Sequence, residues 1–171
     1  MRAIRANSSG YVHGTSGSPQ CILEQNEYAA RVAENEAKLK AKADNAPLID
    51  PLHIAEIEAK GARFTRGNVV FTARDVTGQV VWLEKGTKAA GFEHLKARGH
   101  ITQLAKYFGV SEGDIPKMLR NIIRDGRIVS NKTVTRGNCI GYERKYEYNC
   151  KHIILAAIGT NGFIVTAYPD D

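Results

Sequence analysis

The C-terminal third of the chain constrains the fold most, because its pattern is that of short strands joined by tight turns. Two apolar stretches, Ile153–Ile158 and Phe163–Tyr168, flank Thr160-Asn161-Gly162, and Asn-Gly in such a setting is the strongest short-range signal for a β-hairpin. Ile153–Ile158 is apolar on both faces, as expected of a central strand buried on both sides. Further β-rich segments precede it at Arg127–Val134 and Tyr142–Tyr148. We therefore predict an antiparallel sheet at this end of the chain.

The segments before this sheet are mainly helical. An expected hairpin, Asn68–Ala73 with Gln79–Leu83, has β-branched and aromatic composition around a Thr77-Gly78 turn. Helices are expected near residues 87–98, 101–108 and 112–125. Helices followed by an antiparallel sheet define an α+β fold.

The N-terminal part differs in composition. Residues 7–19 are rich in Ser and Gly and indicate a flexible leader. Glu24–Ala43 is rich in Ala, Glu and Lys without Gly or Pro, which favours a helix. Asp50 is placed to cap a second helix that begins at Pro51 and runs to Lys60. We expect residues 1–62 to form a leader and helical linker and residues 63–171 to form the functional domain.

The positive charge is concentrated in that second part. The chain carries a net charge of +6. Residues 1–62 hold seven basic and eight acidic side chains, net −1, whereas residues 63–171 hold seventeen and ten, net +7. Such an excess suits a polyanionic partner, because displacing counterions from phosphates drives binding. A basic surface kept for solubility is the alternative.

Several classes of protein are disfavoured by the composition. No apolar run approaches the ~20 residues that span a bilayer, and the first twenty residues lack the apolar stretch of a secretory signal. Three cysteines are too few for a disulfide scaffold. Cys139, Cys150 and His152 have no zinc-site spacing. We expect neither a membrane span, nor a metal, nor a cofactor.

The first candidate site is the stretch Gly91–His100 (GFEHLKARGH). On a helix, His94 and Arg98 share a face, and Gly99 would end that helix and leave His100 on a connector that can turn back. Two imidazoles beside a guanidinium can cleave RNA without metal, since one removes the 2′-hydroxyl proton, the other protonates the leaving 5′-oxygen, and the cation stabilises the phosphorane. These can equally be surface residues of a polar helix.

The second candidate site is the C-terminal strand Phe163–Pro169. Thr166 and Tyr168 are two positions apart and therefore project from one side of the sheet. Their hydroxyls can bind a phosphate, and the tyrosine ring can stack on a base. Thr and Tyr are also common strand residues, so a structural role is the alternative.

A rival interpretation concerns Ile101–Val129, which resembles a helix-turn-helix. Its second helix carries Lys117, Arg120 and Arg124, and a winged-helix protein would place that helix in the DNA major groove. Asp114 at the start of the helix argues against DNA binding, because it repels phosphate. A non-enzymatic DNA-binding protein is thus the alternative function.

Aromatic and basic residues also alternate near the sheet, a pattern compatible with bases stacked beside phosphate contacts. The residues concerned are Tyr142, Arg144, Lys145, Tyr146, Tyr148 and Lys151. The same pattern is common on an edge strand with a basic outer face.

Two motifs together, G-F-E-H-L-K-A-R-G-H after a strand and N-G-F-I-V-T-A-Y-P at the end, resemble the barnase/EndoU/colicin/RelE-type (BECR) ribonucleases. More narrowly, they are similar to the toxin domains of contact-dependent growth inhibition and other polymorphic toxins. The resemblance covers residues 63–171 and implies helices packed on a twisted antiparallel sheet, with the active site in a cleft on the sheet.

The resemblance also implies roles for particular residues. His94 and His100 would be the acid and base, Thr166 and Tyr168 would hold the phosphate, and Arg98 would offset its charge. The histidine spacing departs from the EndoU pattern, so which imidazole is the base stays open. RNA contacts are expected from Lys85, Lys96, Arg144, Lys145 and Tyr146.

A function and partners follow from the same resemblance. It implies metal-independent cleavage of tRNA or another structured RNA, giving a 2′,3′-cyclic phosphate and a 5′-hydroxyl. It further implies delivery into the cytoplasm of a target bacterium as part of a larger secreted or cell-surface protein, and a cognate immunity protein.

Overall fold

The structure is a computed structural model that describes residues 19–44, 46–136 and 139–170, and the chain divides into two units between Ala43 and Asp44. Within the first unit, the described residues belong to α1 (Pro19–Asp44), whose described side chains are exposed. This confirms the predicted helix over Glu24–Ala43. The predicted leader lies outside the described residues, apart from Pro19 at the start of α1.

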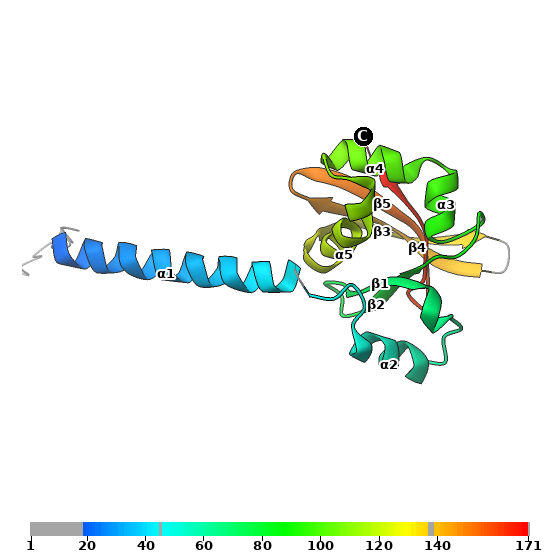
Figure 1. The fold of residues 1–171 in the computed structure, drawn as a ribbon, viewed down its shortest axis with the longest axis horizontal. Helices are drawn as coiled ribbons and strands as arrows, with labels where there is room; N and C mark the ends of the chain where they lie inside the picture. The colour runs from blue at the N-terminus through cyan, green and yellow to red at the C-terminus, as the bar shows by residue number, and fades with distance from the viewer. Residues whose placement is uncertain (1–18, 45, 137–138, 171) are drawn as a thin grey trace, which may run out of the picture. The chain divides into compact units, whose positions relative to one another are not determined.

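The second unit begins with α2 (Pro51–Ala59), which lies against the hairpin of β1 (Val69–Arg74) and β2 (Val80–Glu84) (Figure 1). As predicted, Asp50 caps α2, its carboxylate accepting from the Leu52 N–H at 2.8 Å. The apolar side of α2 is buried in a cluster made of Ile54, Ile57, Val69, Val80 and Trp82. The compact unit therefore starts before the boundary expected near residue 62.

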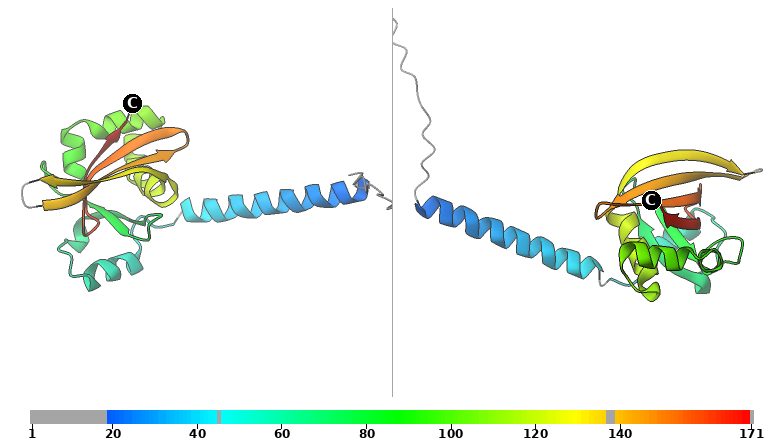
Figure 2. Two further views of the ribbon diagram at one scale, coloured as in Figure 1. Left: turned by 180° about the vertical axis from the view of Figure 1, so that it is seen from behind. Right: turned by 90° about the horizontal axis from the view of Figure 1, so that it is seen from above.

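Three helices and a four-stranded antiparallel sheet complete this unit. Its further elements are η1 (Arg66–Asn68), α3 (Phe92–Ala97), α4 (His100–Phe108), η2 (Glu112–Asp114), α5 (Ile115–Asp125), β3 (Arg127–Arg136), β4 (Cys139–Tyr148), β5 (Lys151–Gly159) and β6 (Ile164–Pro169). The sheet order is β3-β4-β5-β6, and Figure 2 shows its twist. The predicted α+β class is confirmed, with helices and antiparallel sheets in one chain.

The Asn161-Gly162 turn connects β5 to β6 as predicted, with the Gly162 N–H donating to Gly159 O at 2.8 Å. Gly162 has φ of 99°, and a Cβ there would lie 2.1 Å from the Val80 carbonyl oxygen. Its own carbonyl accepts from the Trp82 N–H at 3.0 Å. Glycine is therefore required for the turn to touch β2 and join the hairpin to the larger sheet.

The core lies around α5, which packs against β1 and β4. Ile115, Leu119, Ile122 and Ile123 of this helix are fully buried. Their spacing follows one face of a helix, and they meet apolar residues from the hairpin and the sheet. α5 is thus the central structural helix of the unit.

A buried ion pair links the hairpin to the sheet. The Arg144 guanidinium donates to the Asp75 carboxylate, to Gln79 Oε1 at 2.8 Å and to Asn131 Oδ1 at 3.2 Å. Arg144 is 4% exposed. The expectation that Arg144 contacts RNA is therefore wrong, because its side chain is enclosed and its hydrogen bonds are used inside the protein.

Tyr146, on the same strand, is also enclosed rather than available for stacking on a base. Its side chain is fully buried, and its hydroxyl has no hydrogen-bond partner among the described residues. Burial raises the pKa of Tyr146 to about 12, from an ordinary value of 10.0. In this structure Tyr146 is therefore not accessible to RNA, contrary to the prediction from the sequence.

This burial predicts how alkali affects stability. Because the folded pKa exceeds the unfolded one, the stability linked to neutral Tyr146 is complete below pH 10 and is lost as the pH rises from 10 to about 12. At pH 8 we expect the free energy of unfolding of Tyr146→Phe to equal or exceed that of the wild type. At pH 11 the difference in favour of the variant should be larger by ~1 kcal/mol. Urea denaturation of both proteins at both pH values measures this difference in unfolding free energy. The same difference at pH 8 and pH 11 would contradict the prediction.

Candidate active site

The segment between β2 and α3 attaches the start of α3 to β6. The Gly91 N–H donates to Val165 O at 2.9 Å, and the Glu93 N–H donates to Lys85 O at 2.9 Å. Gly91 has φ of 85°, and a Cβ there would lie 2.8 Å from the Glu84 carbonyl oxygen, so glycine permits this close approach. The helix expected over 87–98 is shorter than predicted because residues 87–91 form a turn.

His94 is held by this turn. Its Nδ1 lies 2.8 Å from the Lys88 carbonyl oxygen. A carbonyl can only accept a hydrogen bond, so Nδ1 carries the proton and donates it. In the neutral ring this leaves Nε2 as the basic nitrogen.

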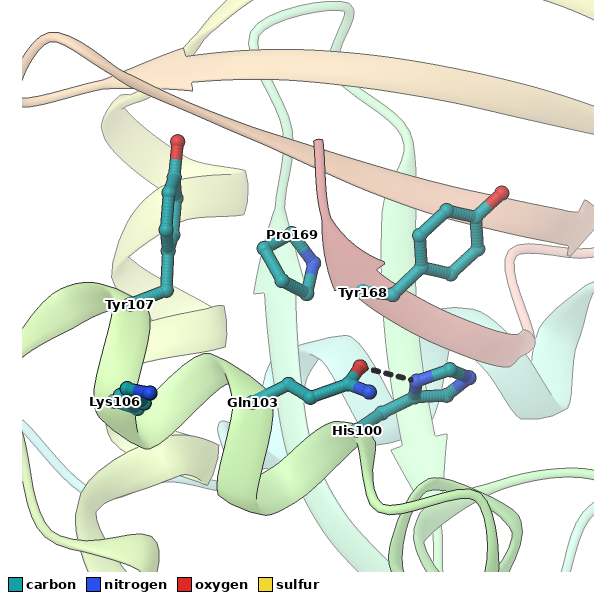
Figure 3. A pocket seen from close by; sticks show the side chains of 6 residues that line it. All are labelled: His100, Gln103, Lys106, Tyr107, Tyr168 and Pro169. Atoms are coloured by element: carbon teal, nitrogen blue, oxygen red, sulfur yellow. Dashed lines mark hydrogen bonds between the residues drawn. The ribbon is translucent and has the colours of Figure 1, made fainter. Parts of the chain in front are cut away.

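His100 is fixed in the same way. Gly99, with φ of 71°, separates α3 from α4, so His100 is the first residue of α4 instead of lying on a connector. Its Nδ1 lies 3.1 Å from Gln103 Oε1 (Figure 3). With Nδ1 donating to that oxygen, Nε2 is again the nitrogen left for proton transfer.

The two histidines and the C-terminal strand converge. The ring centroids of His94 and His100 are 6.4 Å apart, and those of His100 and Tyr168 are 5.5 Å apart. The predicted approach of the helical stretch to the last strand is confirmed for His100 and Tyr168. Imidazole, imidazole and phenol therefore form a row along α3, α4 and β6.

Two members of this row, His100 and Tyr168, line a cleft of about 630 Å³ together with Gln103, Lys106, Tyr107 and Pro169 (Figure 3). The residues from α4 recur every three or four positions and share one helix face. Gln103, Lys106 and Tyr107 were not predicted from the sequence, although their spacing in steps of three or four residues from His100 indicates a shared helix face. The Tyr107 hydroxyl accepts from the His152 N–H at 3.2 Å, which ties this helix to β5.

The predicted cations near the site differ in their availability. Arg98 ends α3 one turn after His94 and is exposed, as is Lys85 at the end of β2. Lys96 is exposed but pairs with Glu93 at 3.1 Å. Lys145 is half-buried and pairs with Asp170. Among the described residues, Arg98 and Lys85 are thus the predicted cations whose charge is not already engaged in an ion pair and is available to a phosphate.

Thr166 is less accessible than the sequence suggested. It is 7% exposed, and its Oγ1 is buried without a hydrogen-bond partner among the described residues. Tyr168, two positions further on, is partly exposed and lines the cleft. In this conformation a substrate can reach Tyr168 but not the Thr166 hydroxyl.

The helix-turn-helix interpretation does not fit the structure. α5, the supposed recognition helix, is mostly buried. Arg120 is 4% exposed and donates to the Ala46 and Pro47 carbonyl oxygens at 2.6 and 3.0 Å. Arg124 pairs with Asp125. A helix enclosed in this way cannot enter the major groove.

In the described ranges, no group of three or more His, Cys, Asp or Glu side chains is arranged to hold a metal ion. None of the helices in these ranges has the length and apolar character needed to cross a membrane. No protein-family model matches the chain, and no curated protein matches it either.

Proposed function

We propose that the chain is a ribonuclease toxin of the BECR type, which cleaves tRNA or another structured RNA without a metal ion. The observation that carries the proposal is the row of His94, His100 and Tyr168. Each imidazole has its Nδ1 bound to an acceptor, and His100 and Tyr168 line a cleft of suitable size for a nucleotide. The order of helices and antiparallel strands is compatible with this fold.

The reaction needs one imidazole as base and one as acid. The Nε2 of one histidine takes the proton of the 2′-hydroxyl while the 2′-oxygen forms a bond to phosphorus. The Nε2 of the other gives a proton to the 5′-oxygen as the P–O5′ bond breaks. The products are a 2′,3′-cyclic phosphate and a 5′-hydroxyl, and each histidine contributes on the order of 10²–10⁴-fold.

Positive charge supports the same step. Arg98 and Lys85 lie beside α3, and Lys106 lines the cleft. A guanidinium or ammonium near the phosphorane stabilises the charge that develops there. The Tyr168 ring supplies a surface on which a base can stack.

Thr166 offers a test of how far the site extends along β6. Thr166→Val keeps the shape of the side chain and removes an unpaired buried hydroxyl, so we expect the free energy of unfolding to be unchanged or raised by about 1 kcal/mol. Because the hydroxyl is enclosed, cleavage should stay within about threefold of the wild type. A folded variant that loses cleavage more than ~100-fold would show that Oγ1 reaches the phosphate after a rearrangement.

The proposal itself is tested by incubating the purified chain with total bacterial tRNA and sequencing the RNA ends. We expect 2′,3′-cyclic phosphate and 5′-hydroxyl ends, formed equally well in EDTA. Intact RNA, or cleavage that stops in EDTA and returns with a divalent ion, would refute the proposed mechanism.

The proposal includes the biological setting of such toxins. A larger delivery protein would carry the chain to a target bacterium, the chain would act in the cytoplasm of that cell, and a cognate immunity protein would protect the producer. Expression of residues 44–171 in bacteria, with growth and tRNA integrity as readouts, tests the toxicity. A catalytically impaired His100→Asn variant is the control.

A further inference from the structure

We infer that the ion pair between Lys145 and Asp170 positions one wall of the cleft, by holding Tyr168 next to His100. The inference rests on the proposed ribonuclease function and deepens it, because it assigns a role to two residues outside the lining of the cleft. It also gives Lys145 a function different from the RNA contact that the sequence predicts.

The first step is the position of Lys145 on the sheet. Lys145 of β4 lies directly opposite Ile154 of β5, and Ile154 lies directly opposite Tyr168 of β6. Residues that are directly opposite in an antiparallel sheet project from the same face. Lys145 and Tyr168 therefore project from one face of the sheet, with β5 between them.

The second step is the span of the ion pair. Asp170 follows β6 directly, two positions after Tyr168, and its carboxylate pairs with the Lys145 ammonium. Because β5 separates β4 from β6, the two backbones are roughly 10 Å apart, which only a long side chain such as lysine can bridge. The two side chains are 35% and 27% exposed. They are therefore partly shielded from water, which strengthens their attraction compared with a fully exposed pair.

The third step concerns the backbone at the end of β6, which is an edge strand of the four-stranded sheet. Near the middle of β6, the Gly91 N–H donates to Val165 O at 2.9 Å. At the end of the strand, Pro169 has no N–H to donate. The Asp170 N–H reaches His152 O at 3.2 Å, the long limit for such a bond. The ion pair thus supports the strand directly after the two β6 residues that line the cleft (Figure 3).

Two explanations of Lys145 predict opposite effects of one substitution, Asp170→Asn. If Lys145 bound RNA phosphate itself, this substitution would release its ammonium and add positive charge, so RNA should bind more tightly. If the ion pair positions Tyr168, the substitution releases the end of β6 and RNA should bind more weakly. The reason is that the tyrosine ring then no longer offers a fixed surface on which a base can stack.

The experiment measures kcat and KM for cleavage of tRNA. We expect Lys145→Met and Asp170→Asn each to raise KM about five- to tenfold through loss of stacking. Both should leave kcat within about threefold, because the two histidines are unchanged. Lys145→Arg keeps the charge and the length, so its KM should stay within about twofold. Arg127→Met, which removes the cation of an ion pair elsewhere on the sheet, is the matched control and should keep the wild-type KM.

Reversal of the pair gives a rescue test. Lys145→Asp and Asp170→Lys should each raise KM at least as much as the neutral variants. Their combination leaves the net charge unchanged and restores two opposite charges, so it should bring KM back to within about threefold of the wild type. A lower KM in Asp170→Asn, or a double variant no better than the single ones, would overturn the inference.

A measurement without RNA separates this inference from the ribonuclease proposal. The nuclear Overhauser effect between the ring protons of His100 and Tyr168, whose centroids are 5.5 Å apart, reports their contact. We expect it to weaken by about half or more in Lys145→Met and Asp170→Asn, as the end of β6 samples other positions. It should persist in Lys145→Arg. This pattern without cleavage of any RNA would refute the ribonuclease proposal and leave the positioning role standing. An unchanged effect in both neutral variants would overturn the positioning role.

Discussion

His100→Asn is expected to lower the single-turnover rate of RNA cleavage about 10³-fold, with the fold intact. His100 has its Nδ1 bound to Gln103 and its ring near both His94 and Tyr168, so its Nε2 is the group best placed to move a proton at the cleft. General acid–base catalysis by one side chain is worth about 10²–10⁴-fold. The side chain is half-exposed, so its replacement should change the free energy of unfolding by less than about 1 kcal/mol.

Two comparisons sharpen this prediction. His94→Asn should cause a drop of similar size, and the double variant should be little worse than either single one, because two groups that act in one step are not additive. His53→Asn is the matched control, since His53 belongs to α2 and hydrogen-bonds with Thr72 away from the cleft. We expect it to cleave within twofold of the wild type. A His100→Asn variant that is folded and fully active would remove this histidine from the mechanism.

Local signals in the sequence predicted the elements well. The Asn161-Gly162 turn and the Asp50-Pro51 start of α2 depend on residues adjacent in the chain, and both are confirmed. The length of the helix around His94 was overestimated, because the loop before it closes through contacts of Gly86 and Gly91 with backbone atoms that sequence patterns do not reveal.

The burial of β4 could not be predicted in the same way. Arg144 and Tyr146 project from one side of the strand and Lys145 from the other, and both sides carry polar groups. Arg144 can point inward because it pairs there with the buried carboxylate of Asp75, a residue far from it in the sequence. Arg120 was misassigned for a similar reason, because its partners are the carbonyl groups of Ala46 and Pro47.

The candidate site was predicted in outline and missed in detail. The motifs containing His94, His100 and Tyr168 led to groups that do converge. Gln103 and Lys106 belong to no recognisable motif, and only their spacing from His100 along one face of α4 places them at the cleft. Thr166 lies on β6, against which both α3 and α4 pack, and its burial is a tertiary property that no local sequence pattern reveals.

The largest effect on stability is expected from Arg144→Met, which should lower the free energy of unfolding by about 3–5 kcal/mol. The substitution leaves the Asp75 carboxylate buried without its cation, and removing one partner of a buried pair costs this much. Arg127→Met is the matched control. Arg127 pairs with Glu147 from the neighbouring strand while its side chain is 74% exposed, so its loss should cost less than about 1 kcal/mol.

Urea denaturation at pH 7 measures both variants, and Asp75→Asn completes a double-mutant cycle. Asp75 also accepts from the Thr77 and Gln79 backbone N–H groups, at 2.8 and 3.0 Å, so the single Asn variant should be destabilised as well. The double variant should cost less than the sum of the two by more than 1 kcal/mol, because the pair is broken only once. The contrary result would be that Arg144→Met lowers the free energy of unfolding no more than Arg127→Met does. In that case the β1–β2 hairpin would be held by apolar packing on α5 and by the Trp82–Gly162 hydrogen bond, and the ion pair would only orient it.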